Sequence, residues 1–293
     1  SRGLGDVYKR QGTLFTKAEG RNEMDSIWIN APAKINIGLD VIRRREDGYH
    51  EVKMIMQSIR LFDRLTLTKT KEPGIKLTTN LSYLPVNEDN LVYQSAKRLM
   101  DEFHLEGGLD IKLDKRIPVA AGMAGGSTDA ASCMLAINDL YGLGLSKRHL
   151  MKRGVKLGAD IPYCILKGTA LSEGIGEKLS TIPAMPSCYI LIAKPNIHVS
   201  TKWVYTNLVL DEHTNHPDID GMLASMKKRD LLSLSNQIGN VLESVTIPAY
   251  PQIAAIKECM LQNGALGSLM SGSGPTVFGI FDDKDKAMAA KEK

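Results

Sequence analysis

Apolar residues in the first half of the chain recur at two spacings: every second residue in short runs, and every third or fourth residue in longer ones. Alternation at every second position is typical of half-buried strands. Such runs predict strands over residues 27–30, 35–41, 65–68, 75–78 and 109–113. The helical spacing predicts one helix from its capping residue Asn90 through Phe103, and another that carries Ala130 and Ile137 and ends near Gly142. This half therefore mixes strands and helices.

The second half continues the mixture. A short helix is expected near residues 147–157, and strands over residues 169–172 and 189–193, the latter opening a second domain. Helices follow over residues 201–208, 221–228, 231–242 and 253–263, and Gly264 closes the last of them. A final strand is expected over residues 276–281, before an amphipathic helix from Asp285. Elements in this order predict an α+β fold of two domains with a cleft between them.

The expected domain boundaries follow from the same pattern. Residues 1–23 show no periodicity and are rich in polar residues and glycine, so they are expected to be a non-native or disordered extension. Met24 looks like the natural start. The first domain is expected over residues 24–184 and the second over residues 185–293.

Composition excludes several classes of protein. The chain has 293 residues, 43% of them hydrophobic, but no run of about 18 apolar residues and no apolar segment at its start. Neither a membrane span nor a signal peptide is therefore expected. Four scattered cysteines without a C-x-x-C pair fit reduced thiols in the cytoplasm. Of the net charge of +4, residues 1–23 supply +2, and the remaining +2 is too little for a nucleic-acid interface.

The most informative stretch is a glycine-rich loop before a helix. Residues 118–132 read P-V-A-A-G-M-A-G-G-S-T-D-A-A-S. Glycine lets backbone N–H groups approach an anion, and a cap by Ser127 or Thr128 would add the open N–H groups of a helix start. This arrangement predicts a nucleotide phosphate site. The loop lacks the lysine of a Walker A loop and the Rossmann spacing. The alternative is a helix that merely begins after a glycine turn.

Three further segments complete a pattern. Residues 31–39 read A-P-A-K-I-N-I-G-L, residues 158–164 read G-A-D-I-P-Y-C, and residues 270–278 read M-S-G-S-G-P-T-V-F. With the glycine loop between the first two, the chain resembles the GHMP kinase superfamily from about Met24 to its C-terminus. The segment R-R-E-D-G-Y-H-E-V at residues 44–52 narrows the resemblance to members that phosphorylate a cytidine diphosphate derivative of methylerythritol.

The resemblance implies a reaction and its partners. A two-domain GHMP kinase fold, with its active site in the cleft, would transfer the γ-phosphoryl group of ATP, with Mg²⁺, to the 2-hydroxyl of cytidine diphosphate methylerythritol. This is a step of the non-mevalonate isoprenoid route. The transfer would be in line and direct. The enzyme would be cytoplasmic, a monomer or homodimer, and without nucleic-acid or membrane partners. The family pattern adds another strand at the end, so the second domain is expected to be truncated.

The resemblance also assigns roles to residues. Asp160 would be the catalytic base. The alternative is a structural role, in which the side chain of this turn aspartate hydrogen-bonds to its own backbone. Lys34 would hold Asp160 ionised and stabilise charge on the transferring group. Asn36 lies two residues further on, hence on the same strand face, and would bind substrate. Tyr49 and His50 would recognise the cytosine by stacking and hydrogen bonding.

Two glycine loops are assigned to ligands. The first would wrap the ATP phosphates with residues Pro118, Val119, Ala120, Ala121, Gly122, Met123, Ala124, Gly125, Gly126, Ser127 and Thr128. Ser127 or Thr128 would help to place Mg²⁺, although no metal ligand is assigned. The second loop would close on the substrate with Gly272, Ser273 and Gly274. Asp129 is expected in the first turn of the helix, where it would interact favourably with the helix dipole. Adenine contacts are expected from residues 58–67 and 87–91.

Three alternatives remain. Another kinase of the superfamily would act on mevalonate or homoserine, and Tyr49 and His50 argue against it. A non-catalytic nucleotide-binding protein would not need Lys34 and Asp160. A truncated chain would be too unstable to act, because a missing strand would expose a sheet edge.

Overall fold

The computed structural model describes residues 25–293, which form two compact units. The first contains the described residues up to Ala33 together with Arg60–Ile117 and Gly125–Leu166. The second contains Lys34–Ile59, Pro118–Ala124 and Lys167–Lys293. The extension expected over residues 1–23, and Met24, lie outside the described residues. The expected boundary between residues 184 and 185 stays a prediction.

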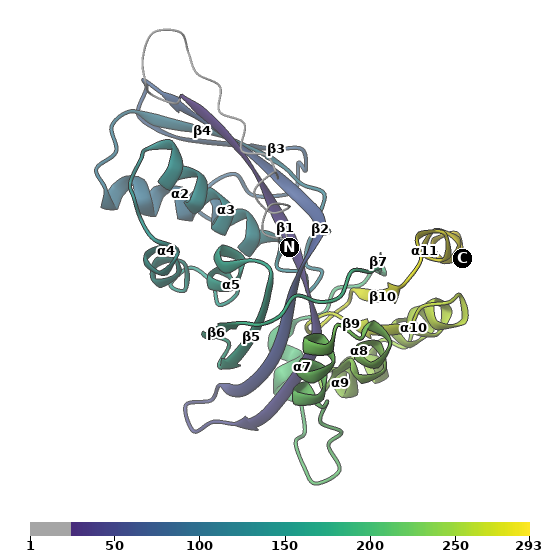
Figure 1. Cartoon of the computed structure of the whole chain (residues 1–293). Helices are drawn as coiled ribbons and strands as arrows, with labels where there is room; N and C mark the ends of the chain where they lie inside the picture. Colours follow the sequence, from purple (N-terminus) through teal and green to yellow (C-terminus); the bar gives the residue numbers. More distant parts are fainter. Residues whose placement is uncertain (1–24) are drawn as a thin grey trace. The chain divides into compact units, whose positions relative to one another are not determined.

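The first unit packs helices against a small sheet (Figure 1). Strand β4 (Gly108–Asp114) pairs in parallel with β3 (Gly74–Thr79) and antiparallel with the second part of β2 (His50–Thr70). Helix α2 (Leu91–Glu102) packs on α3 (Gly125–Leu140), which also contacts α5 (Ile161–Leu166) and α4 (Lys147–Gly154). Leu67, Ile111 and Leu99 are fully buried because the strand and helix stripes face one another.

The second unit contains two groups of strands. The first part of β2 pairs with β5 (Thr169–Gly174), which pairs with β6 (Lys178–Thr181). In the same sheet, strand β1 (Ser26–Arg44) lies next to β2 and pairs in parallel with the short β8 (Gly239–Asn240). A separate antiparallel sheet has the order β7 (Tyr189–Ala193), β10 (Val277–Phe281) and β9 (Gly267–Met270). Its buried Phe278 and Ile280 share a core cluster with Ile35 and Ile37 of β1.

Six helices complete the described part of the second unit. They are α6 (Thr201–Asn207), α7 (Ile219–Lys228), α8 (Leu231–Gln237), α9 (Glu243–Ala249), α10 (Gln252–Gln262) and α11 (Lys284–Lys291). Side chains cap several of them, as Ser200 does for α6 and Asp230 for α8. Within residues 25–293, none of the helices combines the length and the apolar character that crossing a membrane requires.

Most predicted elements are confirmed, and two of the errors have identifiable physical causes. Asn90 caps α2, its side chain accepting a hydrogen bond from the N–H of Val92. The helix predicted over residues 231–242 is wrong beyond Gln237, since the chain there becomes β8. The amide of Asn240 donates to the carbonyls of Met270 and Gly272, and these distant partners hold the chain extended. Helix α9 is not predicted by the pattern, because it contains Pro248.

The capping prediction for the glycine loop is also wrong. Helix α3 begins at Gly125, so Ser127 and Thr128 lie inside its first turn rather than before it. The hydroxyl of Thr128 is buried and has no hydrogen-bond partner among the described residues. The free N–H groups of the helix start therefore belong to the glycines and to Ser127.

Candidate active site

The backbone of residues 118–124 has the form of an anion-binding loop. Ala120, Gly122 and Ala124 have φ angles of 51°, 69° and 54°, which places every second residue in the left-handed region. Alternation of this kind turns successive N–H groups towards one point and makes a concave site for an anion. Two of the three are alanines, and an alanine pays a conformational penalty of about 1–2 kcal/mol there. The loop conformation is thus held by its surroundings.

Ser271 is one of the residues that hold this loop. Its hydroxyl donates to the carbonyl of Gly122 at 3.1 Å and accepts from the N–H of Asn36 at 3.4 Å. A Cβ at Gly122 would lie 2.4 Å from the carbonyl oxygen of Ser271. Position 122 therefore requires glycine for two reasons: a Cβ would clash with the backbone of Ser271, and the left-handed φ angle favours glycine. The sequence places Ser271 in the second loop, but its contact with the first cannot be read there.

Replacing Gly122 with alanine is therefore expected to destabilise the protein by roughly 2–5 kcal/mol, from the left-handed backbone and the clash together. Gly142 is the matched control, because it has a φ of 62° and open space where a Cβ would point. Gly142→Ala should cost only about 1–2 kcal/mol. Thermal unfolding of both variants is the measurement. Equal losses would show that the contact with Ser271 imposes no constraint.

Lys34 and Asn36 lie beside the same loop. The Nζ atom of Lys34 donates to Oδ1 of Asn36 at 2.7 Å, and the two residues are 6% and 1% exposed. This bond confirms that the two side chains share a face of β1. The N–H of Lys34 donates to the carbonyl of Met123 at 3.2 Å. A Cβ at Gly272 would lie 3.7 Å from Oδ1 of Asn36. The second unit thus brings together Lys34, which is assigned to catalysis, Met123 of the loop assigned to ATP, and Asn36 and Gly272, which are assigned to substrate binding.

The remaining residues of the second loop have structural partners. The hydroxyl of Ser273 is hydrogen-bonded to that of Thr201 at 2.8 Å, at the start of α6. Gly274 donates its N–H to the carbonyl of Ser271, closing a tight turn, and has a φ of 87°. Asn240 fixes the same turn through two carbonyls. Substrate binding by Ser273 and Gly274 stays a prediction. No local signal marks Thr201 or Asn240.

The segment expected to recognise a base places one aromatic ring near another. Tyr49 is 61% exposed, and its N–H donates to the carboxylate of Asp47, which shapes the turn before it. The ring of His50 lies 5.2 Å from that of Tyr205 in α6, at a tilt of 45°. Burial, with a smaller contribution from the Arg44 cation, lowers the pKa of His50 below its usual value. The imidazole is therefore neutral at pH 7. The contact of Tyr205 with the His50 ring is not predicted from the sequence.

The first unit contains the other assigned residues. Asp160 is half-buried directly before α5, and its carbonyl accepts the N–H of Cys164 at 3.0 Å, the first bond of that helix. A Cβ at Gly158 would lie 4.0 Å from the hydroxyl oxygen of Ser127. The turn before Asp160 therefore lies beside the first turn of α3. Whether Lys34 acts on Asp160 stays a prediction.

Three buried charges lie under the start of α3, and they are called the buried charge cluster below. The Nζ atom of Lys115 pairs with the carboxylates of Asp63 and Asp129, and all three side chains are less than 5% exposed. Burial raises the pKa of Asp129 to about 8, although the Lys115 cation opposes the shift. The expected dipole role of Asp129 is wrong, since the residue lies beyond the first turn and faces Lys115.

These residues do not fit a magnesium ion held by protein carboxylates. Asp63 and Asp129 both face an ammonium group, which competes directly with a cation. Within residues 25–293, no group of three or more histidine, cysteine, aspartate or glutamate side chains is arranged to hold a metal. The hydroxyl of Thr128 is buried, which leaves that of Ser127 as the more accessible of the two. No step of the chemistry is therefore assigned to a protein-bound metal.

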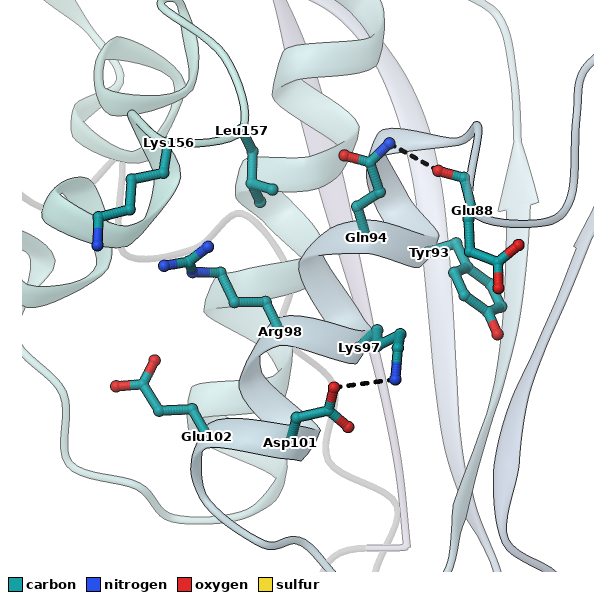
Figure 2. A pocket seen from close by; sticks show the side chains of 9 residues that line it. All are labelled: Glu88, Tyr93, Gln94, Lys97, Arg98, Asp101, Glu102, Lys156 and Leu157. Atoms are coloured by element: carbon teal, nitrogen blue, oxygen red, sulfur yellow. Dashed lines mark hydrogen bonds and ion pairs between the residues drawn. The ribbon is translucent and has the colours of Figure 1, made fainter.

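A groove of about 790 Å³ runs along the outer face of α2 (Figure 2). Among its charged side chains, Lys97 pairs with Asp101 at 2.9 Å, and Glu102 pairs with Arg153, which lies outside the lining. The Nε atom of Arg98 is buried and has no hydrogen-bond partner among the described residues. Gln94 donates to the carbonyl of Glu88 at 2.6 Å. Of the segments expected to contact adenine, only Glu88 lines this groove. The groove therefore offers no support for an adenine pocket there.

Comparison with known proteins gives consistent matches. The family model described as "GHMP kinases N terminal domain" matches residues 90–168, and "GHMP kinases C terminal" matches residues 222–293. The chain is 53% identical to the 4-diphosphocytidyl-2-C-methyl-D-erythritol kinase of Lachnospira eligens over 92% of this chain and 93% of that protein. It is 55% identical to the same kinase of Lachnoclostridium phytofermentans, with coverages of 91% and 92%.

A solved structure agrees with these matches. The crystal structure of a 4-(cytidine 5'-diphospho)-2C-methyl-D-erythritol kinase superposes with a TM-score of 0.78 at 32% identity. It covers 90% of this chain, and this chain covers 94% of it. The α+β fold expected from the strand and helix pattern is thereby confirmed.

Proposed function

The chain belongs to the GHMP kinases, within the family of 4-diphosphocytidyl-2-C-methyl-D-erythritol kinases, and from this membership we propose how its residues carry out the reaction. The enzyme transfers the γ-phosphoryl group of ATP to the 2-hydroxyl of 4-diphosphocytidyl-2-C-methyl-D-erythritol, in the non-mevalonate route to isoprenoid precursors. Identity above 50% over nine-tenths of both chains is the observation that carries this conclusion.

The proposed chemistry is a direct in-line displacement. The carboxylate of Asp160 takes the proton of the 2-hydroxyl while that oxygen attacks the γ-phosphorus. The bond from the γ-phosphorus to the bridging oxygen breaks, and ADP leaves. Lys34 is the cation that stabilises charge on the phosphoryl group, and Asn36 fixes the position of its ammonium at 2.7 Å. Phosphoryl transfer needs mainly positioning and charge neutralisation, and these residues supply both.

The phosphates of ATP are proposed to bind the loop of residues 118–124 and the start of α3. The alternating left-handed residues of the loop support this role, since they gather N–H donors around one point. The first turn of α3 adds further unpaired N–H groups and the positive end of a 16-residue helix.

The cytosine is proposed to bind at Tyr49 and His50, with Tyr205 as an additional contact. Tyr49 is an exposed residue, and an exposed phenol ring offers a face for stacking. A neutral imidazole offers one donor and one acceptor, as the edge of cytosine requires. The position of Tyr205 against the His50 ring limits how that imidazole is oriented.

His50→Ala is expected to raise the KM for the cytidine substrate about tenfold and to leave the KM for ATP unchanged. The estimate corresponds to one lost hydrogen bond of about 1.4 kcal/mol. Steady-state kinetics with each substrate varied in turn is the measurement. His213→Ala is the control, because that side chain is 85% exposed. An equal rise in both KM values would place His50 outside base recognition.

Several finer properties stay predictions of the family resemblance. We propose that Mg²⁺ is required, that the enzyme is a monomer or homodimer, and that it acts in the cytoplasm on a small-molecule substrate without nucleic-acid or membrane partners. The domain limits at residues 24–184 and 185–293 have the same status.

The decisive experiment is ADP release with Mg-ATP and the cytidine substrate, run beside mevalonate and homoserine. Turnover only with the cytidine compound is the expected result. Turnover only with another alcohol would keep the kinase chemistry and overturn the substrate. No turnover with any alcohol, in a protein that still unfolds cooperatively, would favour a nucleotide-binding protein without kinase activity.

A further inference from the structure

The buried charge cluster of Asp63, Lys115 and Asp129 contacts the chain on both sides of the phosphate loop. Lys115 and its two successors lead into the loop at Pro118, and Asp129 lies in α3, which follows the loop. The ammonium of Lys115 bridges the carboxylate of Asp63 in β2 and that of Asp129, the latter at 2.8 Å. The cluster is closed to solvent, so its members do not reach a bound nucleotide.

The entry to the loop is held by three successive N–H groups. The N–H of Lys115 donates to Oδ1 of Asn80 at 2.8 Å, and the N–H of Ile117 donates to Oδ1 of Asp63 at 2.8 Å. The N–H of Arg116 donates to the same carboxylate oxygen. Asn80 also donates its amide to the carbonyl of Lys115 at 3.1 Å. Side chains from distant strands and turns thus replace a sheet partner along this segment.

The exit from the loop is held by the same ammonium. A Cβ at Gly125, the first residue of α3, would lie 3.2 Å from Nζ of Lys115 and 3.3 Å from the side chain of Ile117. The ammonium therefore fills the space directly against the helix start, and its bond to Asp129 ties it to the second turn. One buried side chain fixes the helix whose first N–H groups are expected to receive phosphate.

We propose that Asp63, Lys115 and Asp129 are positioning residues for the phosphate loop and that the contacts of the Lys115 ammonium with the two carboxyl groups set the affinity for ATP. The proposal rests on the proposed role of this loop in binding ATP. Buried ion pairs contribute little net stability compared with apolar substitutes, but they fix geometry. Phosphate affinity depends on N–H donors that converge within a few tenths of an ångström, and a shift of about 1 Å can cost a hundredfold in rate.

The test uses Lys115→Met and the double variant Lys115→Met/Asp63→Asn. The single change leaves a buried carboxylate unpaired and is prone to misfolding. The double change removes the charges of Lys115 and Asp63 together and leaves in place the Asp129 carboxyl group, whose pKa is raised by burial. The amide that replaces the Asp63 carboxylate keeps a carbonyl oxygen that accepts from the backbone. Binding of a non-hydrolysable ATP analogue is measured by calorimetry, and the KM of each substrate by ADP release. Lys97→Met is the control, since its side chain is 52% exposed on α2 and pairs with Asp101 there.

The expected result is an analogue affinity and a KM for ATP at least about tenfold poorer in the double variant, with the KM for the cytidine substrate changed less than about twofold. Lys97→Met should match the wild type. Unchanged analogue affinity in a folded double variant would overturn the proposal. So would losses that only follow the folded fraction, because they indicate a purely structural role. Wild-type protein that binds the analogue without turning over the cytidine substrate would refute the proposed function and leave this test valid.

Discussion

Asp160→Asn is expected to lower kcat by about 10²–10⁴-fold while the KM for ATP stays within about twofold of the wild type. The side chains have the same size, but an amide cannot take the proton from the attacking hydroxyl. Asp160 begins α5 through its backbone carbonyl, which the substitution keeps. The fold should therefore survive, and the loss should fall on the chemical step.

Steady-state ADP release with both substrates saturating measures this effect. Asp101→Asn is the control, because its carboxylate is 64% exposed and pairs with Lys97 on the surface of α2. Near-normal turnover of Asp160→Asn would show that the base is assigned wrongly. A loss confined to the KM for ATP would instead make Asp160 a nucleotide-binding residue.

Local sequence patterns predict what depends on neighbours along the chain. Alternation along β1 places Lys34 and Asn36 on one strand face, and their hydrogen bond confirms it. The cap of α2 at Asn90 follows from residue type and spacing. The strand at residues 189–193 is predicted with its observed limits, because Pro186 and Pro195 bracket a short apolar run.

Contacts between distant segments cannot be predicted in the same way. The carboxylate of Asp63 meets the ammonium of Lys115 across 52 positions, and no local pattern pairs them. Ser271 reaches the carbonyl of Gly122 across 149 positions. The role of Asp129 is missed because the pattern places the helix start too late: a start at Gly125 turns this residue from the exposed first turn to the buried side.

The second large effect expected is a change in the pH dependence of stability. Burial raises the pKa of Asp129 to about 8, so the folded protein holds a proton that the unfolded chain, with an ordinary pKa near 3.9, releases at neutral pH. The contribution of this carboxyl group is therefore fully present below about pH 4 and is lost as the pH rises to about 8. The protein should therefore lose stability on the alkaline side of this interval.

Asp129→Asn should flatten this dependence, because an amide keeps an acceptor for Lys115 and does not ionise. Near Asp129, Lys115 has a raised pKa and stays charged, while burial raises the pKa of Cys133 to about 12 and keeps its thiol neutral. Asp63, the other acidic residue of the cluster, is present in both the variant and the wild type. Melting temperatures at pH 5, 7 and 9 should therefore fall less in the variant than in the wild type, and at pH 9 the variant should be the more stable protein. Asp101→Asn should follow the wild type at each pH. Parallel curves for Asp129→Asn and the wild type would mean that Asp129 ionises on the alkaline side without cost, and that Lys115 neutralises both carboxylates.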